Sequence, residues 1–484
     1  MKINKPLCEA VFNYEKAKVY PLHTPGHKGG RGLEKSLLAA LGKRAAAIDV
    51  SLMSELDDIH CPEGCLREAQ ELASQVYGSD LCFFAVNGTT VAIHAMLMGA
   101  LKPGEKVLVP RNAHRAVAGA LVLGGLEAVF LPPEYDDFFG INTQITPEAV
   151  EQALAADSDI KAVLVTSPNY YGLAADLKAI AEIAHSRGAV LLVDEAHGAH
   201  LGFSEALPPS ALQCGADACA QSTHKTLGAL TQCSMLHVKG QRIDQKKIAS
   251  AMSLLTTTSP NYLLMASLDA ARAQLAAGGA EMAEAALVVA EKLRYSLHDI
   301  GGLEVLDASI LERSEVAGFD GTKVTVNVAG LGITGIEAGD ILRENGLAVE
   351  LVDRNNVLFL LTYADDNEEI ESIINKITDI FYMIKKQNKP PLALSNNCRM
   401  PVAQQILSAR QAFYADTEAI AFSEAVGRIC TEQISFYPPG IPVIIPGELV
   451  SKEILTYCQS MLALGLPVSG PQDGSLRKIQ VVKQ

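Results

Sequence analysis

The feature that most limits how this chain can fold is an alternation of short apolar segments with helical ones between residues 81 and 270. Stretches such as AADLKAIAEIAHSRG separate the apolar segments, which include LCFFAV (81–86), KVLVP (106–110), AVLVTS (162–167) and AVLLVD (189–194). This alternation predicts a mostly parallel sheet covered by helices, and ligands of such sheets bind at the carboxyl ends of the strands. We therefore expect an α/β large domain at residues 36–270.

The rest of the chain predicts three smaller parts, because 484 residues are too many for one ordinary core. The segment PLHTPGHKGGRG is too rich in Gly and Pro for a helix or strand, so we expect residues 1–35 to form an N-terminal arm. An Ala-rich helical stretch at 271–300 opens a small α+β domain (271–388), and a C-terminal α+β domain (389–484) follows. The further elements that we expect are strands near 303–307, 323–329, 347–352 and 356–363, a helix at 367–386 and a linker at 385–397.

Composition narrows the class of protein. The net charge of −15 argues against a nucleic-acid surface, which needs clustered Lys and Arg, and is compatible with a small cationic substrate. The first residues lack the apolar run of a signal peptide, and no later stretch is apolar enough to span a bilayer. Neither Cys61 with Cys65 nor Cys214 with Cys219 forms a CxxC pair, so we expect reduced thiols and a cytoplasmic location.

The first motif, AVNGTT (85–90), places a Gly-Thr turn between an apolar strand and the helical stretch VAIHAMLMGAL. Gly88, Thr89 and Thr90 would present N–H groups and hydroxyls at a helix N-terminus, where a phosphate is bound well. A strand, a Gly-Thr turn and a helix are also a common connection without any ligand. The motif alone therefore leaves both interpretations open.

The second motif begins at Asp194, which ends the strand AVLLVD and opens DEAHGAH. A carboxylate there lies in a low-dielectric setting, so its pKa would rise unless a cation such as a protonated pyridine nitrogen faces it. DEAH also occurs in helicases, but the chain has no GxxxxGK[ST] loop to bind a triphosphate. A metal site of Asp194, His197 and His200 is a further alternative, although it lacks a supporting cluster of ligands, and we expect no metal.

The third motif is STHKTLGALTQ (222–232), which places Lys225 among small hydroxyl and imidazole residues. Most lysines are solvated surface residues. A partly desolvated lysine has the free amine that imine formation requires. The setting of Lys225 therefore favours a covalent role.

The order and spacing of the three motifs resemble the fold-type I enzymes that use pyridoxal 5′-phosphate (PLP), and finer details resemble the ornithine/lysine/arginine decarboxylase family. The stretches that carry the resemblance cover nearly the whole chain: HTPGHKGG, ELDDIHCPEG, NGTT, RNAHRA, SPNYYG, VDEAHGAH, QSTHKT, TTSPNYLLMASLD and YPPGIPVIIPGE. The resemblance implies an aspartate-aminotransferase-like large domain. Because the sequence starts directly at the HTPGHKGG arm, it resembles the shorter, biosynthetic-type arginine and lysine decarboxylases.

The resemblance also implies roles for individual residues. Lys225 would bind PLP as a Schiff base, Asp194 would pair with the pyridine nitrogen, and His114 would stack on the ring. His197 would lie beside the ring, although a single histidine is more often structural. Thr257, in TTTSPNY (256–262), would reach the phosphate of the neighbouring subunit. The residues implied to bind the phosphate are Gly88, Thr89, Ser222 and His224.

The implied activity is α-decarboxylation of a basic amino acid. We expect arginine as substrate, giving agmatine and carbon dioxide, with lysine or ornithine as alternatives and Lys225, His197 and His114 as catalytic residues. The partner would be a second copy, in a homodimer or a dimer of dimers with shared active sites. Acidic candidates for the cationic tail of the substrate are Glu55, Asp57, Asp58, Glu432 and Glu448.

Three other functions were weighed. The same cofactor site could support transamination or a lyase reaction. A PLP-binding regulator without catalysis would also keep Lys225. The GxGxxG match at Gly330, Gly332 and Gly335 resembles a dinucleotide site, but only two short strands and one helix follow it before the linker, so we expect no nicotinamide cofactor.

Overall fold

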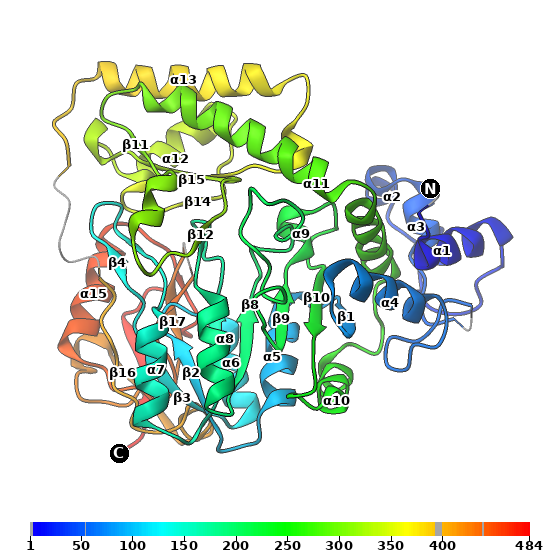
Figure 1. Cartoon of the computed structure of the whole chain (residues 1–484), viewed down its shortest axis with the longest axis horizontal. Coiled ribbons are helices and arrows are strands. Elements are labelled where there is room, and N and C mark those ends of the chain that lie inside the picture. Colours follow the sequence, from blue (N-terminus) through cyan, green and yellow to red (C-terminus); the bar gives the residue numbers. More distant parts are fainter. Residues whose placement is uncertain (1–2, 54, 393–398, 438–439) are drawn as a thin grey trace. The chain divides into compact units, whose positions relative to one another are not determined.

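The computed structural model describes residues 3–53, 55–392, 399–437 and 440–484 (Figure 1). The chain divides into two compact units. The first unit comprises Met1–Ala100, Leu192–Phe203 and Ser210–Ala280, and the second comprises Leu101–Leu191, Ser204–Pro209 and Glu281–Gln484. Within the described residues, no helix combines the length and the apolar character needed to cross a membrane.

The first unit is built on a sheet in the strand order β8-β9-β10-β1. These strands are β8 (Val190–Asp194), β9 (Ala218–Gln221), β10 (Ser234–Val238) and β1 (Leu81–Ala85). Strands β8 and β9 are parallel, and β10 is antiparallel to both of its neighbours. The short helix α9 (Thr223–Thr226) links β9 to β10, so Lys225 directly follows the carboxyl end of β9.

Helix α5 (Gly88–Ala100) packs against β1, β9, β10 and α10 (Gln245–Leu255). It carries no charged residue, and a helix that is apolar on nearly all sides is expected to be buried. Its close contact with α10 depends on Gly99, where an added Cβ would lie 2.6 Å from the side chain of Ile248. The two helices can approach only because this position lacks a side chain.

The N-terminal part of the first unit forms four helices: α1 (Pro6–Ala17), α2 (Lys35–Leu41), α3 (Lys43–Ile48) and α4 (Cys65–Tyr77). The PLHTPGHKGGRG segment between α1 and α2 has neither helix nor strand, as predicted. The buried Asp269 carboxylate accepts hydrogen bonds from the N–H groups of Leu7 and Cys8, at 3.0 and 3.2 Å. This carboxylate ties the start of α1 to the long helix α11 (Tyr262–His298).

In the second unit, three parallel strands pair in the order β6-β2-β3. They are β6 (Ile160–Thr166), β2 (Lys106–Pro110) and β3 (Glu127–Leu131), joined by α6 (Arg115–Gly124) and α7 (Pro147–Ala156). Helix α8 (Leu177–Ser186) follows β6 and packs on α7. All four apolar segments predicted as strands are therefore strands: β1, β2, β6 and β8.

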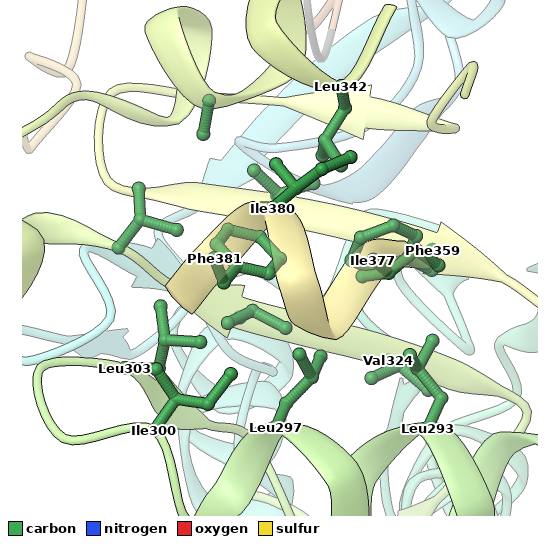
Figure 2. Close-up of a cluster of buried hydrophobic side chains, with 14 of the residues drawn as sticks. Leu293, Leu297, Ile300, Leu303, Val324, Leu342, Phe359, Ile377, Ile380 and Phe381 are labelled. Carbon is green, nitrogen blue, oxygen red and sulfur yellow. The ribbon is translucent and has the colours of Figure 1, made fainter. Parts of the chain in front are cut away.

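The predicted small domain is also present, in the second unit. Its antiparallel sheet has the order β11-β13-β15-β14, with strands β11 (Glu304–Val305), β13 (Lys323–Asn327), β15 (Asn356–Leu360) and β14 (Leu351–Val352). Helices α12 (Gly335–Glu344), α13 (Ile370–Lys386) and the end of α11 cover it (Figure 1). Side chains of the helices and of the sheet, such as Leu293, Phe359 and Phe381, face one another and form one buried core (Figure 2).

The C-terminal part of the second unit has its own buried core around Phe422, Ile434 and Ile454. Its helices and strands are α14 (Ala409–Phe413), α15 (Lys452–Ala463), β16 (Thr417–Ala421) with β20 (Lys478–Val482), and β18 (Pro442–Ile444), β17 (Ile434–Phe436) and β19 (Val468–Ser469). The linker predicted at 385–397 lies partly outside the described residues. The predicted domain boundaries remain predictions.

Candidate active site

All of the residues predicted for catalysis and cofactor binding, except His114, belong to the first unit. Lys225 is half-buried on α9, and its Nζ lies 2.9 Å from Nε2 of His197. His197 follows β8 and is 4% exposed. The ends of two neighbouring parallel strands therefore bring an amine and an imidazole within hydrogen-bond distance.

Asp194 is the last residue of β8, where it pairs with Ala220 of β9. It is 2% exposed, and its Oδ1 accepts a hydrogen bond from the N–H of Ala196 at 3.2 Å. Burial raises the pKa of the Asp194 carboxyl group above its ordinary value, and the positive charge of Lys225 partly opposes this rise. Asp194 is thus a buried carboxylate that is stabilised by a nearby cation.

The next residue, Glu195, is buried in a different environment. Its carboxylate accepts hydrogen bonds from Nε2 of Gln221 and from the N–H of Ala211, both at 2.7 Å. Burial raises the pKa of Glu195 to about 7, although these two donors act in the opposite direction. These contacts give Glu195 a structural role, because they connect the end of β8 to β9 and to the loop at Ala211.

The turn at 88–90 begins α5, as the sequence predicted. Gly88 has φ +77°, and a Cβ added there would meet nothing within 4 Å. Thr89 is buried, and its Oγ1 shares hydrogen bonds with Oγ of Ser222 and Oγ of Ser234, the latter at 2.6 Å. Thr90 is exposed. The structure thus joins the turn after β1 to Ser222 after β9 through hydroxyl groups.

His224 and Thr257 make local contacts in the first unit. Nδ1 of His224 lies 2.8 Å from the carbonyl oxygen of Cys233, and burial lowers the pKa of His224. The carbonyl oxygen of Thr257 is 3.2 Å from Nε2 of His60, and its Oγ1 accepts from the N–H of Ser259. The predicted contact of Thr257 with the phosphate of a neighbouring subunit remains a prediction.

His114 belongs to the second unit, where it is the N-cap residue of α6. Its Nδ1 accepts a hydrogen bond from the N–H of Ala116 at 3.2 Å. In a neutral imidazole the proton is then on Nε2. The predicted stacking of His114 on a cofactor ring remains a prediction.

Four of the five acidic candidates for the substrate tail make hydrogen bonds or an ion pair within the protein. Asp57 accepts N–H donors at the start of α4, including Gly64 at 2.7 Å and Leu66 at 3.1 Å. Glu432 accepts from the N–H groups of Gln472 and Gln480. Glu448 is 0% exposed and pairs with Arg111. Oδ1 of Asp58 accepts from the N–H of His60 at 2.9 Å, but Asp58 and Glu55 are both exposed, so these two stay as candidates.

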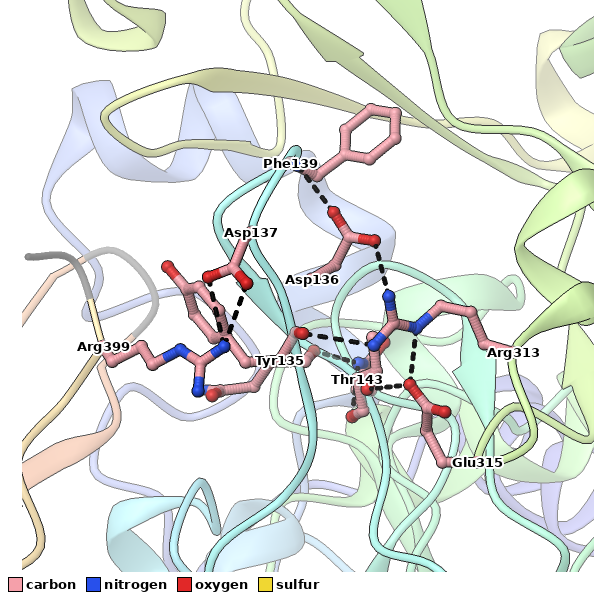
Figure 3. Close-up of polar contacts among 10 residues, drawn as sticks. Tyr135, Asp136, Asp137, Phe139, Thr143, Arg313, Glu315 and Arg399 are labelled. Carbon is pink, nitrogen blue, oxygen red and sulfur yellow. Dashed lines mark hydrogen bonds and ion pairs between the residues drawn. The ribbon is translucent and has the colours of Figure 1, made fainter. Parts of the chain in front are cut away.

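The carboxyl ends of β2 and β6 border a cavity of about 130 Å³ in the second unit. Its wall includes Asn112, Thr166, Tyr170, Asn355, Phe436 and Met461. One side is the hairpin of β4 (Tyr135–Asp136) and β5 (Ile141–Asn142). Arg313 holds this hairpin by donating to Asp136 Oδ2 and to the Tyr135 carbonyl, both at 3.1 Å, and to Glu315 Oε1 at 2.6 Å (Figure 3).

Sequence analysis missed two features of these sites. Ser234, the first residue of β10, and Gln232, two residues before it, contact the turn at 86–89, yet their side chains were given no role. Arg111 and Glu448 lie in RNAHRA and YPPGIPVIIPGE, but nothing in either stretch identifies the other as its partner. Only their inclusion in the quoted stretches could have drawn attention to Gln232 and Arg111, while Glu448 was named only as an acidic candidate for the substrate tail.

Family models match most of the chain. The model described as "Orn/Lys/Arg decarboxylase, major domain" matches residues 5–369, and "Orn/Lys/Arg decarboxylase, C-terminal domain" matches residues 394–467. The chain is 41% identical over 483 residues to a protein of Halalkalibacterium halodurans named arginine decarboxylase, covering 99% of this chain and 98% of the relative. It is 39% identical over 481 residues to a Bacillus subtilis protein of the same name, covering 99% and 98%.

More distant proteins agree with this assignment. The constitutive lysine decarboxylase of Escherichia coli is 26% identical over 557 residues, covering 96% of this chain and 77% of the relative. The crystal structure of a Francisella novicida lysine decarboxylase has the same fold, with a TM-score of 0.83 at 22% identity, covering 100% of this chain and 82% of that one. The sequence motifs, the fold and the full-length relatives agree: this chain belongs to the Orn/Lys/Arg decarboxylase family.

Proposed function

We propose that this protein is a PLP-dependent α-decarboxylase of arginine that produces agmatine and carbon dioxide. The observation that carries the proposal is the half-buried Lys225 amine, 2.9 Å from Nε2 of His197 and close enough to the buried Asp194 carboxylate to lower its pKa. Membership of the family implies PLP as the cofactor. The residues of the first unit fit this group.

The fit rests on four observations. The buried Asp194 carboxylate, whose pKa burial raises, suits a protonated ring nitrogen, because a cation offsets the cost of burying its charge. The side of Gly88 on which a Cβ would stand is open, so a ligand can approach the backbone there. Thr89 and Ser222 supply linked hydroxyl donors for a phosphate. Lys225 provides the amine that would bind the cofactor carbonyl carbon.

When bound, PLP supplies an electron-accepting ring that takes up the electrons of the broken bond to the carboxylate. The protein contributes binding, orientation and proton transfer. Asp194 holds negative charge where the ring nitrogen would carry its proton. His197 Nε2 lies at hydrogen-bond distance from Lys225 Nζ, so either group can hold the proton that the product carbon needs.

The choice of arginine rests on the relatives named arginine decarboxylase, which are 41% and 39% identical to this chain over nearly their full lengths. Lysine is the second candidate, because the constitutive lysine decarboxylase of Escherichia coli also aligns with 96% of the chain. We also propose a homodimer or a dimer of dimers, in which Thr257 contacts the phosphate of the neighbouring subunit, and a cytoplasmic location. Light scattering after size-exclusion chromatography tests the assembly, and a fully active monomer contradicts it.

The test is release of carbon dioxide by the PLP-loaded protein from arginine, lysine and ornithine in parallel, with the absorbance spectrum of the cofactor. We expect release from arginine, and none from Lys225→Ala, which should also lose the absorbance band of lysine-bound PLP. Lys246→Ala is the matched control, since this exposed lysine of α10 lies outside all of the motifs. Turnover and an unchanged band in Lys225→Ala would refute the assignment. Formation of a keto acid instead of carbon dioxide would indicate transamination.

A further inference from the structure

A chain of three hydroxyl groups lies at the turn that begins α5. Oγ1 of Thr89 is hydrogen-bonded to Oγ of Ser222 and lies 2.6 Å from Oγ of Ser234. All three residues are buried, and Ser234 is 0% exposed. Ser234 is the first residue of β10 and pairs directly with Ala85, the last residue of β1 (Figure 1). Ser234 therefore lies next to the turn that begins α5 but is not part of it.

The number of protons on these three hydroxyl groups limits how Ser234 can be hydrogen-bonded. Three hydroxyls carry three protons, and the two hydrogen bonds between them use two. Among the described residues, Oγ of Ser234 has only Thr89 as a hydrogen-bond partner. If Ser234 donates to Thr89, the remaining proton belongs to Thr89 or Ser222, and it can be donated to a ligand outside the chain. By donating, Ser234 thus keeps the proton that is available to a ligand on Thr89 or Ser222.

A second hydrogen bond, from Gln232 just before β10, reaches the same turn. Nε2 of Gln232 donates a hydrogen bond to the carbonyl oxygen of Val86, two residues before Gly88. The backbone of Gln232 has φ +86°, a left-handed conformation that is rare outside glycine. Such conformations persist where the surrounding structure holds them, and they cluster at functional sites. Gln232 and Ser234 therefore contact the turn at two points. One is the carbonyl oxygen of Val86, and the other is the hydroxyl of Thr89.

We propose that Ser234 is a positioning residue for the cofactor phosphate: it orients the hydroxyls of Thr89 and Ser222 as donors without touching the phosphate itself. This inference rests on the proposed binding of PLP in the first unit. It predicts that the Ser234 hydroxyl contributes to affinity for the phosphate group and not to affinity for the rest of the cofactor. A side chain that only filled space in the sheet would affect both alike.

The test compares PLP with pyridoxal, which has the same ring and aldehyde but no phosphate. Dissociation constants of both are measured by absorbance titration of apoenzyme, for the wild type and for Ser234→Ala. We expect Ser234→Ala to bind PLP about five- to tenfold more weakly, as for the loss of one hydrogen bond, while pyridoxal binding changes less than about twofold. The inhibition constant of inorganic phosphate against PLP binding should also rise in the variant. Ser250→Ala, on α10, is the control, because its hydroxyl donates only to its own helix.

A double-mutant cycle separates the hydroxyl chain from a general disturbance. In a Thr89→Val background the chain is already interrupted, so adding Ser234→Ala should change the ratio of the two dissociation constants by less than about twofold. If Ser234→Ala does not fold, Ser234→Cys replaces it, and a smaller loss in the same ratio is expected because a thiol is a weaker donor. Equal weakening of PLP and pyridoxal, or no change in either, overturns the inference. A wild type that binds no PLP would instead contradict the proposed function.

Discussion

Replacing Arg111 by methionine should destabilise the second unit strongly, because it leaves a buried carboxylate without its cation. The Arg111 and Glu448 side chains are 4% and 0% exposed, and Nη2 of Arg111 lies 3.1 Å from Oε2 of Glu448. Without Arg111, the only hydrogen-bond donor to this carboxylate among the described residues is the N–H of Ile445, at 2.8 Å. Removing one member of a buried pair costs about 3 to 5 kcal/mol, and we expect this range for Arg111→Met.

The cost should depend on pH. Burial raises the pKa of Glu448 above its ordinary value, while Arg111 lowers it, so Arg111→Met raises this pKa further. A carboxyl group whose pKa is higher in the folded than in the unfolded state loses stabilisation as pH rises through the folded value. The variant should therefore be most destabilised relative to the wild type at pH 8. The difference should shrink as pH falls and Glu448 becomes protonated.

Urea unfolding of the PLP-loaded protein at pH 8 and pH 6, followed by circular dichroism, measures this effect. The double variant Arg111→Met/Glu448→Leu should recover at least about 2 kcal/mol of the loss, since it removes the buried charge as well. The exposed pair Lys292 and Glu371, at 2.6 Å, provides the control, and Lys292→Met should cause no measurable loss. Two results would contradict this role of the pair. In one, Arg111→Met is no less stable than the double variant; in the other, Arg111→Met loses the same free energy of unfolding at both pH values.

Two further predictions concern the neighbouring carboxylates at the end of β8. Asp194→Ala should retain part of the PLP but lose most carbon dioxide release, because the ring nitrogen loses its anionic partner, and an unchanged rate would contradict this role. Glu195→Gln should gain stability relative to the wild type between pH 5 and pH 8, because the rise of the Glu195 pKa from 4.5 to about 7 corresponds to a loss of up to roughly 3 kcal/mol as pH rises through this range. Urea unfolding at the two pH values tests it, and a difference that is independent of pH would refute it.

Local signals in the sequence were sufficient to predict four strands of the large sheet and the motif positions. β1, β2, β6 and β8 are short apolar runs bounded by turns, and each predicted run contains or overlaps the observed strand. The Gly88 turn and the Asp194 strand end lie where they were expected, because a turn after a strand depends on residues adjacent in sequence. The antiparallel pairing of β10 with β1 was not predicted, since strand order depends on packing between distant segments.

Contacts between distant residues were beyond sequence reasoning for the same reason. Arg111 and Glu448 are 337 positions apart, and Thr89 and Ser234 are 145 apart. Each of these residues alone has a common local explanation: a charge near a strand end, a hydroxyl in a strand. Glu448 was a candidate for binding a cationic substrate tail, which is what an isolated acidic residue suggests. Its burial beside Arg111 changes this interpretation.

The Arg111 pair also bears on how His114 is held. The loop between β2 and α6 is fixed at both ends: Arg111 donates to Glu448 and, at 2.8 Å, to the carbonyl oxygen of Val443, and His114 caps α6 through Nδ1. The N–H of Arg111 is bonded to the carbonyl of Leu131, which adds a third restraint. Because both contacts of the guanidinium come from the C-terminal part of the chain, that part helps to set the orientation of the loop that carries His114. If His114 contacts the cofactor as the family resemblance implies, Arg111→Met should lose activity at a temperature where the protein is still folded, and unchanged activity would contradict that prediction.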